Sequence, residues 1–468
     1  MHGRTNAFLL VTLICVPMAA EEGSPTWPSF RGPEHTGVAP GADPPIEWGE
    51  DKNVRWKVEL EGTGHASPVV WGNRIFVMSA VKTDKEIEAE PENETSRNRA
   101  ALPILLASQQ SGASKGQAQQ QQQQRRSRPP RVKPTHVHQF MVSAYDLASG
   151  KRVWNTVVRE EVPHESLHST ASQVSASPVT DGEHVWAFFG SRGLYCLDMQ
   201  GDVVWEKQFG IQTTRNEFGE GASPAVHGGL IVINWDHEGD SFIVALDKKT
   251  GEQRWRVARD ERTSWSTPLV VRDGKKDVVV VSAWSRVVGY DLASGEELWS
   301  VSGLGPNVVP TPVADNKMIW VMSGWRDAHG MAIRYPGARG DLTGSDRVWW
   351  EAEIGLSYVP SAVLAGGRVF FFQRFAGILS CYELASGEAC YDRQRIDGYE
   401  DIYASLVAAG DRAYSVSRDG SGLVFSTTGE FEVLARNELD DVFNATPAIV
   451  GDTIILRGDR YLYNISAE

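Results

Sequence analysis

Cysteine is scarce in this sequence, with 4 residues among 468. Cys15 falls inside an apolar N-terminal stretch, which leaves Cys196, Cys381 and Cys390 for the rest of the chain. Such an odd, small number excludes a disulfide framework, and no Cys and His spacing matches a zinc site. Cys381 and Cys390 flank one turn in CYELASGEAC, where they could form a disulfide across a hairpin or remain small buried thiols.

Positive charge is also in deficit. The sequence has 46 Lys and Arg residues against 60 Asp and Glu residues, which gives a formal net charge of −14. Nucleic-acid binders normally carry a basic surface, so this balance argues against nucleic acid as a partner. It favours a well-dispersed protein, which we expect to be a monomer.

Recognisable catalytic motifs are missing as well. The sequence contains no nucleophile elbow, no phosphate-binding loop and no zinc signature. The acidic turn DHEGD (Asp236–Asp240) could hold a cation, but it lacks the ligand spacing of a calcium loop. We therefore assign no catalytic residue and no metal ligand from the sequence.

Long apolar runs are confined to the N-terminus. A positive start, the apolar run AFLLVTLICVPMAA and a small residue at Ala20 have the arrangement of an export signal over residues 1–20. The run is too short to span a bilayer, and no other stretch is longer. The sequence predicts an exported protein, periplasmic or extracellular, with no membrane span. Cys15 would permit a lipoprotein, although Ile14 stands where such signals normally carry a small residue.

Repetition is what the sequence has in abundance. Eight segments share a Ser or Thr in an apolar setting, usually followed by Pro, as in ASPVVWGNRIFVMS and ATPAIVGDTIILRG. From the second copy onward they recur roughly every 44 residues, a period typical of propellers and solenoids. Each period holds four short apolar runs and leaves no room for a helix. The sequence therefore predicts an all-β, eight-bladed β-propeller of four-stranded antiparallel blades over residues 53–468. The repeat hydroxyls belong to Ser67, Ser177, Ser223, Thr267, Thr311, Ser361, Ser405 and Thr446.

Tryptophan and glycine mark one hairpin of the repeat. YDLASGKRVW and YDLASGEELW nearly coincide, and the chain holds 16 Trp and 45 Gly residues. The glycine supplies positive φ at the turn, and the tryptophan that ends the hairpin should wedge between neighbouring blades. The predicted docking residues are Trp56, Trp154, Trp205, Trp255, Trp299 and Trp349, with Tyr391 and Leu434 in two further units.

The eighth repeat stops after its third strand. An unpaired strand edge is a liability for a folded protein. The N-terminal segment NVRWKVEL (residues 53–60) has the fourth-strand pattern, with Trp56 in the docking position. We expect this segment to close the last blade and so to join the two ends of the chain.

The repeats resemble those of a known family. ALDKKTGEQRW and YDLASGEELW are similar to the tryptophan-docking repeats of the PQQ-like eight-bladed propellers. That family includes quinoprotein dehydrogenases and the propeller lipoprotein of the outer-membrane barrel-assembly machine. WPSFRGPEHTGV, within an N-terminal extended segment (residues 21–52), resembles a segment of uncharacterised exported bacterial members. The resemblance specifies a fold and leaves the function open, because one fold hosts many functions.

An insert interrupts the first repeat. Residues 82–138 contain QAQQQQQQRRSRPPR and few aromatic residues, so we expect a disordered low-complexity segment. Its charge is segregated, with an acidic first part and a basic last part. It is either a tolerated solvated loop or a partner-binding segment, and it should project from one face of blade 1.

Equivalent positions of the repeat suggest candidate ligand-binding residues. Two residues before each repeat hydroxyl, the innermost strand begins beside the central channel. We call these eight residues the mouth residues: His65, Ser175, Gly221, Trp265, Val309, Val359, Tyr403 and Asn444. They could line a ligand site or merely fill the channel.

Arginine recurs in the turns between the second and third strands. These turns should lie on the same face as the mouth residues, where guanidinium groups would suit carboxylates and phosphates. Alternatively, each arginine pairs with a carboxylate of a neighbouring blade. The residues are Arg192, Arg286, Arg374 and Arg418, with Arg326 and the pair Arg457 and Arg460 as further candidates.

Three functions fit these features. The first is a non-catalytic binding scaffold of the cell envelope, whose partner is an envelope protein or an anionic ligand. The second, implied by the resemblance, is a PQQ-dependent dehydrogenase with PQQ and calcium at the mouth beside Trp265. The vicinal cysteine pair of those enzymes is absent, their calcium ligands cannot be placed, and repeats this short leave little room for long active-site loops. The third is a carbohydrate-binding propeller that uses the aromatic residues and arginines of the mouth.

Overall fold

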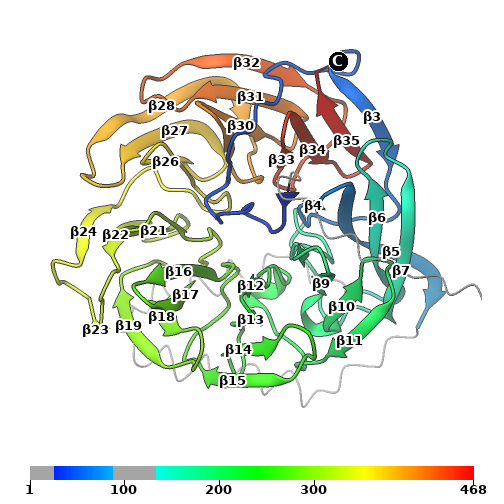
Figure 1. Cartoon of the computed structure of the whole chain (residues 1–468), viewed down its shortest axis with the longest axis horizontal. Coiled ribbons are helices and arrows are strands. Elements are labelled where there is room, and N and C mark those ends of the chain that lie inside the picture. The colour runs from blue at the N-terminus through cyan, green and yellow to red at the C-terminus, as the bar shows by residue number, and fades with distance from the viewer. Residues whose placement is uncertain (1–25, 88–132, 468) are drawn as a thin grey trace, which may run out of the picture.

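Short strands occupy most of the chain. They are rich in β-branched and aromatic residues, which favour β-strands. The computed structural model describes residues 26–87 and 133–467. Within these ranges, eight antiparallel sheets stand around a central axis, and consecutive repeats lie side by side (Figure 1). This arrangement confirms the predicted all-β, eight-bladed propeller and its four-stranded blades.

Each blade runs from an inner to an outer strand. The first four blades are β4 (Val69–Trp71), β5 (Arg74–Glu86), β6 (His136–Asp146) and β7 (Arg152–Glu161); β8 (Val179–Thr180), β9 (His184–Phe188), β10 (Leu194–Asp198) and β11 (Val203–Lys207); β12 (Ala225–His227), β13 (Leu230–Trp235), β14 (Phe242–Asp247) and β15 (Gln253–Ala258); and β16 (Leu269–Asp273), β17 (Lys276–Ser282), β18 (Arg286–Asp291) and β19 (Glu297–Ser302). The last four are β20 (Val313–Ala314), β21 (Met318–Ser323), β22 (His329–Arg334) and β24 (Val348–Ala352); β25 (Val363–Ala365), β26 (Arg368–Phe372), β27 (Ala376–Glu383) and β28 (Ala389–Glu400); β29 (Val407–Ala409), β30 (Arg412–Val416), β31 (Ser421–Ser426) and β32 (Val433–Glu438); and β33 (Ala448–Val450), β34 (Thr453–Arg457), β35 (Tyr461–Ser466) and β3 (Val54–Glu59).

Three further strands and two short 3₁₀ turns complete the described structure. The strands β1 (Thr26–Trp27), β2 (Val38–Ala39) and β23 (Gly340–Asp341) add to the edges of blades 1, 7 and 4, and the turns are η1 (Gly190–Arg192) and η2 (Arg215–Glu217). No helix in the described part of the chain is long and apolar enough to cross a membrane.

The N-terminal strand β3 is the outermost strand of blade 8. It pairs antiparallel with β35, with Val54 opposite Ile465 and Glu59 opposite Tyr461. The two ends of the described chain are thereby hydrogen-bonded into one sheet, and this outer pairing leaves no gap in the circle of blades.

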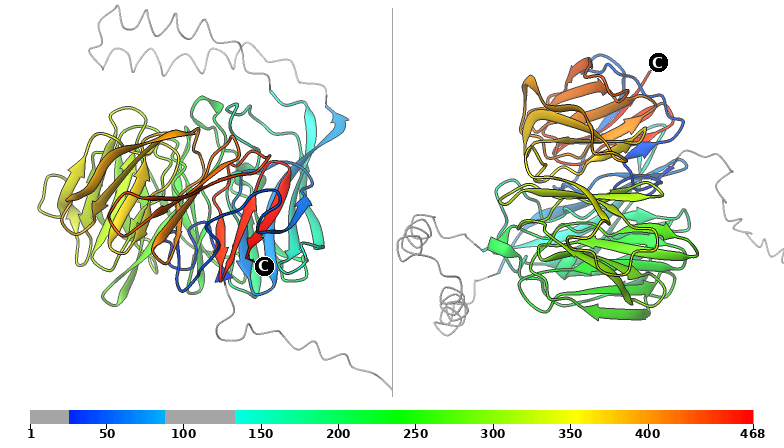
Figure 2. Two further views of the ribbon diagram at one scale, coloured as in Figure 1. Left: turned by 90° about the horizontal axis from the view of Figure 1, so that it is seen from above. Right: turned by 90° about the vertical axis from the view of Figure 1, so that its left-hand side faces the viewer.

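Strands β5 and β6 extend further than the sequence indicates. The insert was expected from Lys82 to His138, whereas β5 continues to Glu86 and β6 begins at His136. The added residues pair across the two strands, with Lys82 opposite His138 and Glu86 opposite His136. The paired ends project from one face of the disc (Figure 2). Residues 88–132 of the insert, and the export signal with Cys15, lie outside the described residues.

The tryptophan that ends each hairpin docks against the next blade. Trp154 donates its indole N–H to Met199 O at 3.0 Å, and Trp255 donates to Leu292 O at 2.8 Å. The turn glycine of the next blade lies against the ring, so that a Cβ on Gly201 would come within 2.6 Å of Trp154. Trp56 likewise donates to Leu147 O, and Trp205 donates to Lys248 O. Trp299 is buried opposite Gly289.

Trp350, and not the predicted Trp349, takes the docking position in blade 5. Trp350 lies opposite Ala332 and donates to Leu384 O at 2.8 Å, whereas Trp349 is 43% exposed. The long connection between β22 and β24, which contains β23, removes the fixed turn spacing on which the alignment depended. In blade 7, Ala435 rather than Leu434 occupies the equivalent position.

The three described cysteines are free thiols. A bulge in the hairpin places Tyr391, and not Cys390, opposite Cys381. Burial raises the pKa of the Cys381 thiol, as expected for a small core residue.

We predict that Trp350→Ala destabilises the protein far more than Trp349→Ala. Trp350 stacks on Trp320 at 4.6 Å between ring centroids and on Tyr382 at 5.6 Å. Truncating a well-packed tryptophan should cost about 3–5 kcal/mol, whereas truncating its exposed neighbour should cost about 1 kcal/mol or less. Urea denaturation of both variants measures this difference, and equal losses would contradict the assignment of the docking position.

Candidate functional site

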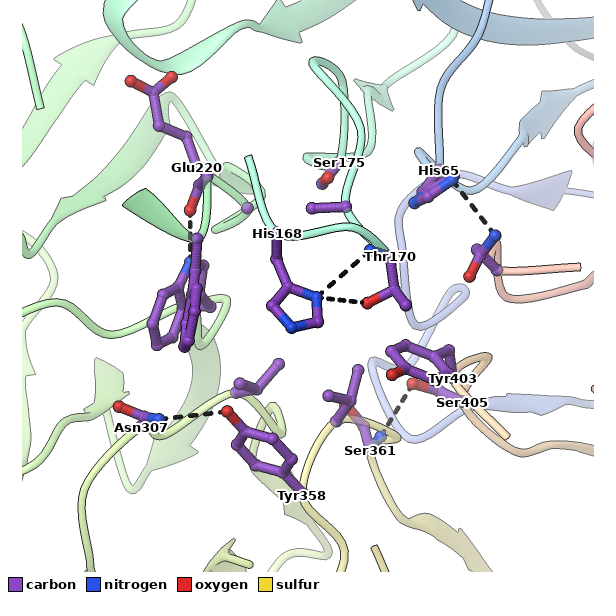
Figure 3. Close-up of a pocket in the computed structure, with 18 of the residues that line it drawn as sticks. His65, His168, Thr170, Ser175, Glu220, Asn307, Tyr358, Ser361, Tyr403 and Ser405 are labelled. Atoms are coloured by element: carbon purple, nitrogen blue, oxygen red, sulfur yellow. Dashed lines mark hydrogen bonds between the residues drawn. The ribbon is translucent and has the colours of Figure 1, made fainter. Parts of the chain in front are cut away.

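The eight mouth residues converge on one cavity on the propeller axis. This axial cavity has a volume of about 1090 Å³ and is open on the face where the inner strands begin (Figure 3). His65, Trp265, Tyr403 and Asn444, which the sequence singled out, all line it. Pockets of such a size commonly hold small molecules.

The N-terminal segment forms the floor of the axial cavity. Strand β1 pairs with β4 of blade 1, and β2 runs parallel to β29 of blade 7, so the chain between them crosses the channel (Figure 1). Phe30, on this crossing, lines the cavity from below. The N-terminal segment therefore crosses the channel at the end where the inner strands finish, opposite to the mouth.

Arg31 anchors this floor. Its guanidinium is 1% exposed and donates to Ala362 O, while Nε and Nη1 lack a partner among the described residues. Burial lowers the pKa of Arg31 to about 9. Comparison of the repeats cannot predict this role, because the segment belongs to no repeat.

The repeat hydroxyls form a closed circle of hydrogen bonds in the cavity wall. In every blade, the backbone N–H of the Ser or Thr donates to the hydroxyl oxygen of the equivalent residue in the next blade, as from Ser361 to Ser405 at 2.9 Å. The circle closes where Thr446 donates to Ser67 at 3.0 Å. The eight distances lie between 2.9 and 3.3 Å.

Aromatic rings cover two opposing parts of the wall. Trp325, Tyr358, Phe375 and Tyr403 form an arc in which consecutive ring centroids lie 5.0, 5.4 and 4.5 Å apart. Trp265 lies beside Phe218 and is held in place by donation of its indole N–H to Gly219 O at 2.6 Å. The rings are fixed, so the wall offers preformed flat surfaces.

His168 is the most central side chain of the cavity, and no sequence pattern predicts its position. It comes from the loop between β7 and β8, and its ring points into the cavity (Figure 3). The backbone N–H of Thr170 donates to Nδ1 at 3.2 Å, so the neutral ring carries its proton on Nε2. Glu165 of the same loop accepts a hydrogen bond from the backbone N–H of Thr214, and burial raises its pKa.

Three buried polar atoms around the cavity lack a partner among the described residues. They are Asn307 Oδ1, Asn444 Oδ1 and Arg215 Nη1. Asn307 is 3% exposed and donates its amide to the Tyr358 hydroxyl, and Asn444 donates its amide to His65. Unpaired buried groups are uncommon in folded proteins and call for an explanation.

The predicted arginines do not gather around the mouth. None of Arg192, Arg286, Arg374 and Arg418 is among the described residues that line the cavity. Arg192 is buried against Glu220 at 3.0 Å, Arg286 pairs with Glu297 at 2.7 Å, and Arg374 donates to Trp325 O. Arg418 stacks on Tyr403 at the edge of the mouth but is paired with Asp401.

Other arginines approach the cavity instead. Arg215 and Arg326 line it, and of these only Arg326 came from the turn pattern. Arg215 belongs to the 3₁₀ turn η2, in a connection between blades, where repeat comparison has no equivalent position to offer. Arg457 is buried and donates to Ala66 O and Ser79 Oγ, while Arg460 pairs with Asp440.

Carboxylates are almost absent from the cavity. Glu220 supplies the sole carboxylate in the lining contributed by the described residues, and it points away from the centre (Figure 3). Its oxygens accept hydrogen bonds from Ser191 N and from Arg192. At the acidic turn, Asp236 forms a buried ion pair with Arg259 at 2.8 Å, so its carboxylate is not free to bind a cation.

Comparisons with known proteins agree with this architecture. The family model described as "Outer membrane protein assembly factor BamB" matches residues 138–391, more than half of the chain. The outer membrane protein assembly factor BamB of Burkholderia pseudomallei is 21% identical over 415 residues, which cover 84% of this chain and 95% of that protein.

Similarity also extends to dehydrogenases. A lanthanide-dependent methanol dehydrogenase of Methylorubrum extorquens is 32% identical over 80 residues, which are 15% of this chain and 13% of that protein. The solved structure of quinohemoprotein alcohol dehydrogenase from Comamonas testosteroni matches with a TM-score of 0.58 at 11% identity, over 95% of this chain and 81% of that one. At that identity the likeness shows the fold.

We predict that Ser405→Ala weakens the circle of hydroxyls measurably. The substitution leaves the buried N–H of Ser361 without its acceptor, which should cost about 1–3 kcal/mol. Ser169, exposed at the same cavity, is the matched control, and Ser169→Ala should change stability by about 0.5 kcal/mol or less. Chemical denaturation compares the free energy of unfolding of the two variants. An unchanged free energy of unfolding for Ser405→Ala would mean that the circle of hydroxyls contributes little to stability.

Proposed function

Because the chain belongs to the PQQ-like β-propeller family of the outer membrane protein assembly factor BamB, we propose that it is a non-catalytic binding protein of the cell envelope. The axial cavity is its binding site. One observation carries this proposal: the axial cavity of about 1090 Å³, crossed by the N-terminal segment, has buried polar atoms in its wall that lack a partner among the described residues. Such a wall is typical of a preformed ligand site.

The predicted export signal and the relatives support the proposed envelope location. The BamB proteins are named for the assembly of outer membrane proteins, and an exported propeller with a similar repeat fits a place in the same compartment. Its broad faces remain available to an envelope protein. Because β5 runs antiparallel to β4, the projecting ends of β5 and β6 lie on the face where the inner strands begin, which is the face of the cavity mouth. Partner binding there and ligand binding in the cavity are compatible.

A PQQ-dependent dehydrogenase is the second candidate. The match to the methanol dehydrogenase of Methylorubrum extorquens favours it. Trp265 and Arg326 in the cavity would suit a flat acidic quinone, which would supply the oxidising group when bound. The donor set fits a metal poorly, however, because the one carboxylate that the described residues contribute to the lining, Glu220, is paired with Arg192, and the chain has no adjacent cysteines. We therefore derive no catalytic step through PQQ.

We expect no turnover from the protein supplied with PQQ. The test is dye-linked oxidation of methanol, ethanol and glucose after incubation with PQQ and either calcium or a lanthanide, alongside the absorbance of bound quinone. Without an open set of carboxylates, the metal that activates the quinone should not be retained. Robust oxidation that disappears in Trp265→Ala would overturn the proposal in favour of the dehydrogenase.

A further inference from the structure

The axial cavity is lined by hydroxyl groups that can still donate a hydrogen bond. Each repeat hydroxyl accepts a backbone N–H, yet none of the eight hydroxyl hydrogens has an acceptor among the described residues. All eight residues line the cavity, together with Arg215, whose Nη1 also lacks an acceptor. A hydroxyl can donate one hydrogen bond while it accepts others. The wall is therefore complementary to a ligand rich in acceptor oxygens.

The positive charge of the lining also favours a ligand with acceptor oxygens. Arg215 and Arg326 face a cavity whose one described carboxylate, Glu220, is already paired with Arg192. Arg215 stacks on Trp284 at 4.5 Å, and Arg262 stacks on the same ring at 5.0 Å, so one indole holds both guanidinium groups in place. Burial lowers the pKa of Arg215, the negative charge of Glu238 opposes this shift, and the charges of Arg262 and Arg326 lower the pKa further. A bound anion would relieve this repulsion.

The unpaired acceptor oxygens of the wall are complementary to the hydroxyl groups of a ligand. Asn307 Oδ1 and Asn444 Oδ1 are unpaired and need donors, which a carboxylate does not supply. A ligand that satisfies the whole wall thus carries both carboxylates and hydroxyls. The aromatic arc from Trp325 to Tyr403, with Trp265 across the cavity, adds flat apolar surfaces against which the C–H faces of sugar rings pack.

We propose that the axial cavity binds an acidic saccharide, a short oligosaccharide of hexuronic acid. A carboxylate lies at Arg215 and Arg326, sugar hydroxyls donate to Asn307 and Asn444, and ring faces pack on the aromatic arc. The cavity volume of about 1090 Å³ suits a few sugar rings. This proposal rests on the proposed binding function and names the ligand class of the same site.

Titration calorimetry on the full chain tests the ligand class. The probes are trimers of galacturonate, mannuronate and glucuronate, each compared with its methyl ester, which keeps the ring and removes the charge. At least one acid should bind about tenfold or more tightly than its ester, because a charge-assisted contact contributes about 1.5–3 kcal/mol. Added salt should reduce this preference at the partly exposed rim.

Variants locate the site. Arg215→Gln and Arg326→Gln should each weaken binding of the acid about tenfold and leave the ester unchanged. Arg286→Gln is the matched control, because Arg286 pairs with Glu297 away from the cavity and its loss should change neither ligand. Asn307→Ala should weaken acid and ester alike. Should Arg215→Gln fail to fold, Arg326→Gln, at an exposed residue, carries the test alone.

The outcomes separate this proposal from the function on which it rests. Binding of no uronate trimer, or acid binding unaffected by Arg326→Gln, overturns the ligand class. If a neutral saccharide or PQQ then binds and Trp265→Ala abolishes its binding, the cavity remains the binding site with another ligand. If uronates, neutral saccharides and PQQ all fail to bind, the proposed function of the cavity fails as well.

Discussion

The closed circle of hydrogen bonds between inner strands is the interaction on which this structure depends. A short hydroxyl side chain at the start of each inner strand reaches the backbone N–H of the preceding blade, and the eighth link joins Thr446 to Ser67. A longer side chain would enter the channel, and an apolar one would leave a buried N–H unpaired. The repeated Ser or Thr is thus explained by the geometry of the axis, and its spacing along the chain is the length of one blade.

The same circle creates the site. Because every hydroxyl oxygen is used as an acceptor for the backbone, its hydrogen is left for the cavity, and the inner wall carries hydroxyl groups that can still donate a hydrogen bond. The N-terminal segment crosses one end of the channel, and these donors face the axial cavity. Ring closure and the chemistry of the wall are therefore consequences of one arrangement, to which the N-terminal segment adds the floor.

Repeat comparison could predict the fold and half of the site. Positions that recur in each blade, such as His65, Trp265, Tyr403 and Asn444, were found because the period places equivalent residues on one circle. It failed wherever the period is broken. The repeat pattern favours Trp349 over Trp350, because a long connection shifts the register of blade 5. Phe30, His168 and Arg215 lie in segments outside the repeat, where there are no equivalent positions to compare. The predicted face of arginines fails for another reason, because carboxylates such as Glu220 and Asp401 pair with these side chains. The paired residues lie far apart in the sequence, so the repeat pattern does not reveal them.

The central claim is that the axial cavity is a ligand site. The most direct measurement is a crystal structure of the full chain grown with a saturating uronate trimer. The account predicts density for sugar rings in the cavity, with a carboxylate at Arg215 and Arg326 and hydroxyl groups at Asn307 and Asn444. Density for the saccharide elsewhere on the propeller, with only water in the cavity, would contradict it.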